Sequence, residues 1–138
     1  MLNGEKMKII MLKGKNSCGK TKTLCILYKK IVPENGKSNC KKQLGGNKCD
    51  FSDIVEYNNK TIAFFTMGDY SIQLCNAMNY YNTLKVDFLI CACNSKLVKP
   101  FQNINNYKHE IINKTVATKK TEEHDLNQKD ADEIFLKI

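Results

Sequence analysis

Residues 8–33 pass from a strand-like pattern to a helix-like one, and this change constrains the fold more than any other stretch. The segment Met7–Leu12 is a short apolar run, typical of a buried strand. From Thr21 onward the pattern is helical, and Pro33 predicts where the helix ends. The apolar residues that recur at helical spacing are Leu24, Leu27, Tyr28 and Ile31. We therefore expect a strand, a tight turn and a helix in direct succession.

A hairpin is expected after this first unit. Ser52–Tyr57 and Lys60–Thr66 are strand-like, and Asn58-Asn59 between them tolerates the positive φ of a tight turn. Residues 62–65 are continuously apolar, which favours a central strand. The first strand carries acidic residues, which favours an edge position.

The remaining segments continue the alternation of strands and helices. In order, they are a turn at Asn35-Gly36, a basic polar loop over 37–49, a helix over Ser71–Thr83, a buried strand over 86–93, a weaker helix over 96–105, a strand over 108–116, a polar loop over 117–128 and a helix over Asp130–Ile138. Such alternation predicts an α/β fold: a three-layer αβα domain over 1–138, with a mostly parallel sheet and an antiparallel edge hairpin.

The charge and cysteine content narrow the range of partners and compartments. The formal net charge is +8, which favours polyanionic partners such as nucleotides or nucleic acids. All 22 basic residues are lysine, so part of this charge could instead reflect codon usage. No apolar run has the length of a membrane span and no signal peptide is recognisable, so no membrane partner is expected. Seven cysteines, several of them in apolar segments, suggest reduced thiols and a cytoplasmic location.

The turn between the first strand and the first helix carries a phosphate-binding pattern. Gly14, Gly19, Lys20 and Thr21 match G-x-x-x-x-G-K-[ST] in full. In such a loop, backbone N–H groups point at a phosphate, glycines permit the conformation, and the helix N-terminus adds positive charge. A glycine-containing turn with surface lysines is the alternative reading.

Residues 7–31 resemble the Walker A unit of the P-loop nucleoside-triphosphatase superfamily. The resemblance implies that Gly14–Thr21 bind the triphosphate of ATP or another nucleotide. Lys20 would contact the β- and γ-phosphates and act in catalysis, and the Thr21 hydroxyl would bind Mg²⁺. The residues between the motif positions would contribute mainly backbone N–H groups; they are Lys15, Asn16, Ser17 and Cys18.

An acidic residue outside the loop, at the end of a neighbouring strand, usually completes such a site by holding Mg²⁺. Asp69 follows the strand 60–66 and is our candidate for metal binding and catalysis, although it suits the N-cap of the next helix equally well. Asp87 begins the strand 86–93, at the opposite end of a parallel sheet, which disfavours it.

The branch of the superfamily stays open. In guanine-nucleotide switch proteins an Asp-x-x-Gly motif ends the second strand, but Phe65 stands at the Asp position here, so adenine is the default. Small kinases rely on arginines, and this chain has none. We therefore expect slow hydrolysis or phosphoryl transfer, with a protein partner as the source of any arginine finger.

Other clusters of cysteine, acidic and histidine residues give weaker indications of a functional site. Cys91 and Cys93 share one strand face and suit core packing better than zinc. The cluster Glu122-Glu123-His124-Asp125 reads as a solvated loop rather than a metal site. The rival function is a non-catalytic regulatory or nucleic-acid-binding module, which the basic loop 37–48 and several tyrosines would serve.

Overall fold

The computed structural model describes residues 7–15, 18–32, 41–44 and 50–138. Strands and helices alternate along these ranges as the sequence predicts. The elements are β1 (Lys8–Gly14), α1 (Lys20–Ile31), β2 (Lys42–Gln43), β3 (Phe51–Tyr57), β4 (Lys60–Phe65), α2 (Ser71–Thr83), β5 (Phe88–Asn94), α3 (Lys99–Asn103), η1 (Ile104–Asn106), β6 (Lys108–Asn113), η2 (Lys120–Glu122) and α4 (Glu123–Phe135).

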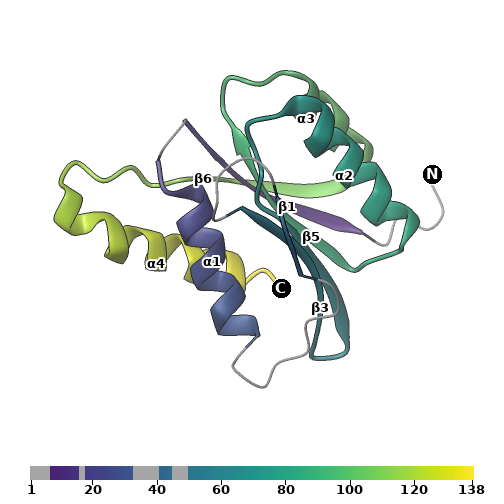
Figure 1. Ribbon diagram of the computed structural model, residues 1–138, viewed down its shortest axis with the longest axis horizontal. Helices are drawn as coiled ribbons and strands as arrows, with labels where there is room; N and C mark the ends of the chain where they lie inside the picture. The colour runs from purple at the N-terminus through teal and green to yellow at the C-terminus, as the bar shows by residue number, and fades with distance from the viewer. Residues whose placement is uncertain (1–6, 16–17, 33–40, 45–49) are drawn as a thin grey trace.

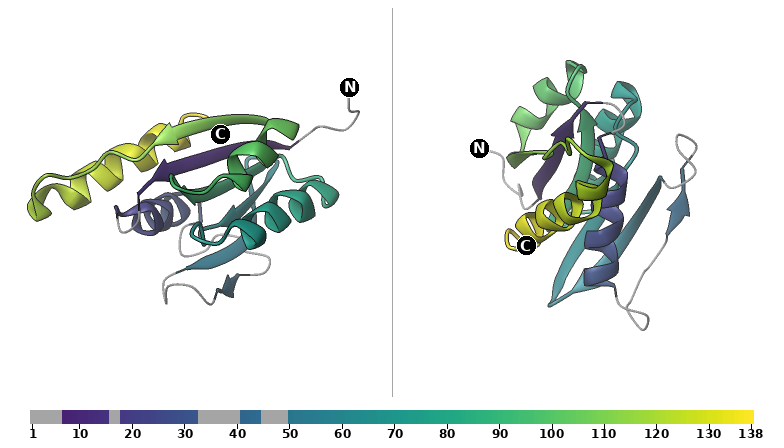
Figure 2. Two further views of the ribbon diagram at one scale, coloured as in Figure 1. Left: turned by 90° about the horizontal axis from the view of Figure 1, so that it is seen from above. Right: turned by 90° about the vertical axis from the view of Figure 1, so that its left-hand side faces the viewer.

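The strands form one mixed sheet in the order β2-β3-β4-β5-β1-β6. Strands β4, β5, β1 and β6 are parallel, whereas β3 runs antiparallel to β4. Helices α1 and α4 lie side by side on one face of the sheet, and α2 and α3 cover the other (Figure 1). The edge-on views show the same layers (Figure 2). The predicted α/β class and mostly parallel sheet are therefore confirmed.

Alternate residues of β1 supply the two cores on either face of the sheet. Ile10 and Leu12 pack under α1 and α4, while Ile9 and Met11 pack under α2. All four side chains are fully buried, which is why β1 reads as a continuous apolar run. No helix in the described ranges is both long enough and apolar enough to cross a membrane.

The hairpin forms as predicted, but its place in the sheet differs. Asn58 and Asn59 have φ angles of 50° and 63°, so they make the left-handed turn that joins β3 to β4. The prediction that the first strand of the hairpin is an edge was wrong, because the short strand β2 pairs with it. The sequence gives no sign of β2, since two polar residues carry no strand period. The predicted turn at Asn35-Gly36 lies outside the described residues.

Two predictions about helix ends were wrong. The residue before α2 is Tyr70, and no side chain caps that helix, so Asp69 is not its N-cap. Helix α4 begins at Glu123, seven positions before the expected start. Glu122 stabilises this start because its carboxylate accepts hydrogen bonds from the Lys119 N–H and the Thr118 hydroxyl. The segment expected to be a polar loop therefore includes the first turns of α4.

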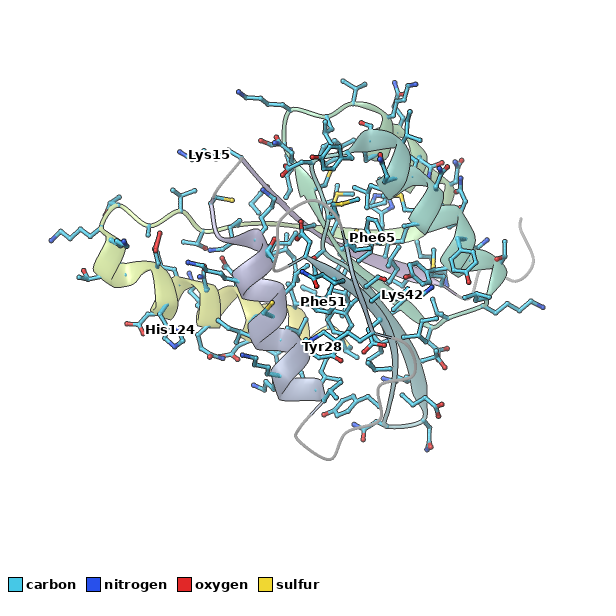
Figure 3. All side chains as sticks on the ribbon, viewed as in Figure 1. Lys15, Tyr28, Lys42, Phe51, Phe65 and His124 are labelled. Atoms are coloured by element: carbon cyan, nitrogen blue, oxygen red, sulfur yellow. The ribbon has the colours of Figure 1, made fainter. Side chains whose placement is uncertain are left out.

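A hydroxyl–carboxylate contact fixes α1 against β3. The Tyr28 hydroxyl donates to Asp53 Oδ2 at 2.6 Å, and Asp53 is only 1% exposed. The Tyr28 ring meets the Phe51 ring edge-on, with centroids 4.8 Å apart (Figure 3). These contacts set the position of α1 over the antiparallel part of the sheet.

A fully buried ion pair joins the end of β6 to α4. Lys114 Nζ lies 3.0 Å from Asp130 Oδ2, and each side chain is 1% exposed. Asp130 also accepts hydrogen bonds from the Thr115 N–H and hydroxyl, at 2.8 and 2.9 Å. The segment after β6 is therefore held firmly against α4.

Gly68 allows the chain after β4 to pass directly over β5. A Cβ at this position would lie 2.4 Å from the Ala92 carbonyl oxygen, which is backbone and cannot rotate away. We expect Gly68→Ala to destabilise the fold by about 1–3 kcal/mol. Thermal unfolding checks this, with Ser95→Ala at an exposed position on the neighbouring turn as the control. Equal melting temperatures for the two variants would contradict it.

Candidate functional site

The loop between β1 and α1 lies at the carboxyl edge of the parallel strands. Two neighbouring strands fix its start, because Ser95 N donates to Gly14 O at 2.9 Å and Lys114 N donates to Lys13 O at 2.7 Å. A Cβ on Gly14 would lie 2.6 Å from Cys18 Sγ, so the Cys18 side chain packs closely over this glycine. Ligands of open α/β sheets bind at this edge.

Among the described residues, no side chain caps the N-terminus of α1. Gly19 precedes the helix in the left-handed region, with φ of 95°. The first turn contains no acidic residue. Its N–H groups and the helix dipole therefore favour a negatively charged ligand. Predicted loop residues Asn16 and Ser17 lie outside the described residues.

Lys20 is a largely buried side chain at this loop, and among the described residues no carboxylate pairs with its ammonium group. Lys20 is 8% exposed. Its Nζ donates to the Lys15 carbonyl at 2.8 Å and lies 3.8 Å from Cys18 Sγ. Within the described ranges it forms no ion pair. A buried cation normally has a counter-ion, so this group is suited to receive an anion.

Thr21 is joined to an acid that the sequence reading did not select. Its hydroxyl donates to Asp50 Oδ1 at 2.9 Å, and Asp50 is 6% exposed. The Thr66 hydroxyl donates to the same oxygen at 2.9 Å and accepts from the Phe51 N–H. Asp50 directly precedes β3, and because β3 is antiparallel its first residue lies at the carboxyl edge of the parallel strands.

Asp69, the predicted acid, also faces this edge but contacts a different partner. It is exposed, and its Oδ1 accepts a hydrogen bond from Asn94 Nδ2 at 3.1 Å. Asn94 ends β5, and its backbone N–H donates to Gly68 O, so β5 fixes this turn. Asp87 lies at the far end of the sheet, as expected, where its Oδ2 accepts from Thr61 N.

A cavity of about 280 Å³ brings these groups together. Lys20, Thr21, Asp50 and Asp69 all line it, together with the Gly19 backbone. Lys15 lines an adjoining cavity instead and lies at the tip of the loop (Figure 3). Two residues of α4 also line the first cavity, Glu123 and Asn127. Sequence reasoning placed these two in a loop and assigned them no role.

Two cysteines of β5, Cys91 and Cys93, are protonated packing groups. Burial raises the pKa of Cys93 to about 12, and the nearby Lys20 ammonium only partly offsets this effect. Burial also raises the pKa of Cys91 strongly. Both thiols are fully buried in the core beneath α2, which agrees with the packing role expected from their shared strand face.

The oxygen groups in the cavity suit a hard divalent cation only in part. Within the described ranges, no three His, Cys, Asp or Glu side chains lie close enough to hold a metal. Mg²⁺, however, commonly takes one or two carboxylates and completes its shell with water and substrate phosphates. The Thr21 hydroxyl and the carboxylates of Asp50 and Asp69 fit that smaller requirement.

Comparison with protein-family models, curated proteins and solved structures found no match to this chain. The function is therefore inferred from the chemistry of the cavity.

Proposed function

We propose that this protein binds a nucleoside triphosphate, with ATP as the default, together with Mg²⁺ in the cavity at the β1–α1 loop. The proposal includes slow hydrolysis of the triphosphate or transfer of its terminal phosphoryl group, in the manner of P-loop nucleoside triphosphatases. The buried ammonium group of Lys20 carries the proposal, because it has no carboxylate partner within the described ranges.

Three features of the loop favour a phosphate over other anions. Lys20 supplies a full positive charge, and the uncapped N-terminus of α1 supplies several N–H donors at the same point. Gly19 adopts a positive φ that turns the loop into the helix. A phosphate has enough acceptor oxygens to use all of these donors together.

Mg²⁺ would bind beside the phosphates, with Thr21 and the acids Asp50 and Asp69 as its protein ligands. The Mg²⁺ ion would neutralise the negative charge that builds up on the phosphate oxygens. Asp50 is the better-placed acid, since it already accepts a hydrogen bond from Thr21. Asp69, whose Oδ1 accepts a hydrogen bond from Asn94, would serve either as a second ligand of Mg²⁺ or as the acceptor of a proton from an attacking water or hydroxyl group.

The rate of phosphoryl transfer should be low for the isolated chain. No arginine is present in the sequence, so the rigid bidentate clamp that neutralises a transferring phosphoryl group is missing. A partner that inserts an arginine can raise such a rate by about 10³ or more. The same observation favours the second candidate, a nucleotide-dependent regulatory module that does not itself turn over substrate.

Thermal shift with Mg-ATP, Mg-GTP and Mg-pyrophosphate tests the proposal. Stabilisation is RT ln(1 + [L]/Kd), so a ligand at about 100 times its Kd adds about 2.7 kcal/mol. No stabilisation by any of the three would refute the proposal. Release of phosphate, measured alone and with candidate acceptors, then separates an enzyme from a regulatory module.

Asp50→Asn tests which acid serves the metal. Asparagine keeps the shape and an acceptor oxygen for Thr21 and Thr66 but removes the charge. We expect the gain in ATP affinity on adding Mg²⁺ to fall by about 10- to 100-fold, as for other altered metal sites. Titration calorimetry with and without Mg²⁺ measures this gain.

Two further variants serve as the comparison for Asp50→Asn. Asp53 is a nearby buried acid of β3 that lies outside the cavity. Asp53→Asn should therefore leave the gain in ATP affinity on adding Mg²⁺ unchanged. Asp69→Asn reports on the other acid of the cavity. A larger loss in Asp69→Asn than in Asp50→Asn would show that Asp69 is the principal ligand.

A further inference from the structure

A second cavity, of about 200 Å³, adjoins the first at the N-terminal end of α4. Cys18, Glu123 and Asn127 line both cavities, so these residues mark the boundary between them. The far side of the second cavity is formed by Thr115, Val116 and Ala117, which follow β6. The ion pair between Lys114 and Asp130 holds that segment in place.

The sizes of the cavities allow one ligand to occupy both. Small-molecule pockets are typically about 300–1,000 Å³, and the volumes here are about 280 and 200 Å³. Neither cavity alone reaches the usual range, whereas the two together do. The first cavity has the phosphate-binding groups, so the second would hold the remainder of the same molecule.

Asn127 is the observation that points to a ligand at the boundary. It is 5% exposed, yet its side-chain amide has no hydrogen-bond partner within the part of the chain that the structure describes. Every fully buried side-chain nitrogen or oxygen there has a partner, so the Asn127 amide must reach the cavity surface. Its Oδ1 lies against Gly19, where a Cβ would approach to 2.8 Å. The amide therefore faces the cavity without a protein partner among the described residues, and a polar ligand group can take up its hydrogen bonds there.

Glu123 places a carboxylate one helical turn before Asn127, on the same side of α4. An ionised carboxylate only accepts hydrogen bonds and repels phosphate, so its partner in this ligand must be a neutral donor. A nucleotide has its sugar between the phosphates and the base. The hydroxyl groups of a ribose would therefore meet Glu123 and Asn127 at the boundary.

We propose that the second cavity holds the nucleoside of a ribonucleoside triphosphate, with Glu123 and Asn127 binding the ribose hydroxyls and thereby selecting ribose over deoxyribose. The proposal rests on the proposed function, because it requires the triphosphate in the first cavity. Val116, Ala117 and Leu126 supply apolar contacts for the faces of the base. The amide of Asn127 both donates and accepts, so it can pair with a hydroxyl in either role.

Titration calorimetry with Mg-ATP, Mg-dATP and Mg-tripolyphosphate tests the proposal. We expect ATP to bind about tenfold more tightly than dATP, because a hydrogen bond to a charged group is lost. Tripolyphosphate should bind at least about tenfold more weakly than ATP, since it has no group for the second cavity. If the donor to Glu123 were a base amine instead, ATP and dATP would bind equally and ribose selection would be wrong.

Variants of α4 separate this role from folding. Glu123→Gln should lower the ATP-to-dATP affinity ratio at least about threefold, and should not weaken tripolyphosphate binding. Glu133→Gln makes the same exchange at an exposed position of α4 outside both cavities, and should leave all three affinities unchanged. Asn127→Ala should weaken ATP binding about tenfold and tripolyphosphate binding less than twofold. Glu123 is exposed, so its variant stays informative if Asn127→Ala fails to fold.

The results distinguish failure of this inference from failure of the proposed function. If tripolyphosphate bound as tightly as ATP, the proposed phosphate site would stand and the proposed nucleoside site would be wrong. An unchanged ATP-to-dATP ratio in Glu123→Gln would overturn the role of Glu123 in ribose selection. Absence of binding by all three ligands would overturn both proposals.

Discussion

Lys20→Met is expected to abolish nucleotide binding without lowering the stability of the ligand-free protein. Methionine keeps most of the aliphatic side chain of Lys20, which is 8% exposed, but removes the ammonium group. In the ligand-free protein that group is buried with only the Lys15 carbonyl and the Cys18 sulfur as partners within the described ranges. Removing a poorly compensated buried charge should leave the melting temperature equal or higher.

Although the stability of the ligand-free protein should not fall, the affinity of Lys20→Met for ATP should fall strongly. Loss of one partner of a buried, hydrogen-bonded charge pair costs about 2–5 kcal/mol, which corresponds to at least about 30-fold in affinity. Titration calorimetry with Mg-ATP measures the affinity, and thermal unfolding without ligand measures the stability. Lys29→Met, at an exposed position of the same helix, is the matched control. A Lys20→Met protein that retains ATP affinity would contradict the proposed function.

Asp130→Asn is expected to cause a large loss of folding stability. It leaves the Lys114 ammonium group, whose side chain is 1% exposed, with the Thr115 carbonyl as a partner but without a counter-ion. Breaking a buried pair in this way costs about 3–5 kcal/mol. For a chain of this size the melting temperature should fall by about 10 °C or more.

Asp132→Asn provides the contrast on the same helix. Asp132 pairs with Lys30 at 3.1 Å, but the two side chains are 48% and 41% exposed, so the pair should contribute less than about 1 kcal/mol. Similar losses in Asp130→Asn and Asp132→Asn would show that burial does not govern the strength of these pairs. Replacing both Lys114 and Asp130 by apolar residues should recover much of the loss, because no buried charge is then left unpaired.

The local parts of the fold could be predicted from the sequence because their signals are short-range. The apolar run before Gly14, the helical period after Thr21 and the Asn58-Asn59 turn each depend on neighbouring residues. The start of α4 could not be found in this way. Its first turns are polar, and it follows the 3-10 turn η2, which Glu122 caps, and packs against α1. Glu123 and Asn127 were consequently assigned to a loop.

Asp50 could not be predicted for a different reason. It lies 29 positions after Thr21, and only the antiparallel direction of β3 brings the two side chains together. Our sequence reasoning looked for an acid at the end of a parallel strand and chose Asp69, which does line the same cavity. The expected antiparallel strand begins at Ser52 and already contains Asp53, so the sequence provides no ground for choosing Asp50.

Two hydroxyl–carboxylate contacts hold α1 against β3, at Thr21 with Asp50 and at Tyr28 with Asp53. They lie about two turns apart along the helix, so α1 can neither rotate about its axis nor slide along the sheet without breaking one of them. The N–H groups at its N-terminus therefore have a fixed direction before any ligand arrives. A binding site that is organised in advance loses little conformational entropy on binding, and more of the contact energy then appears as affinity.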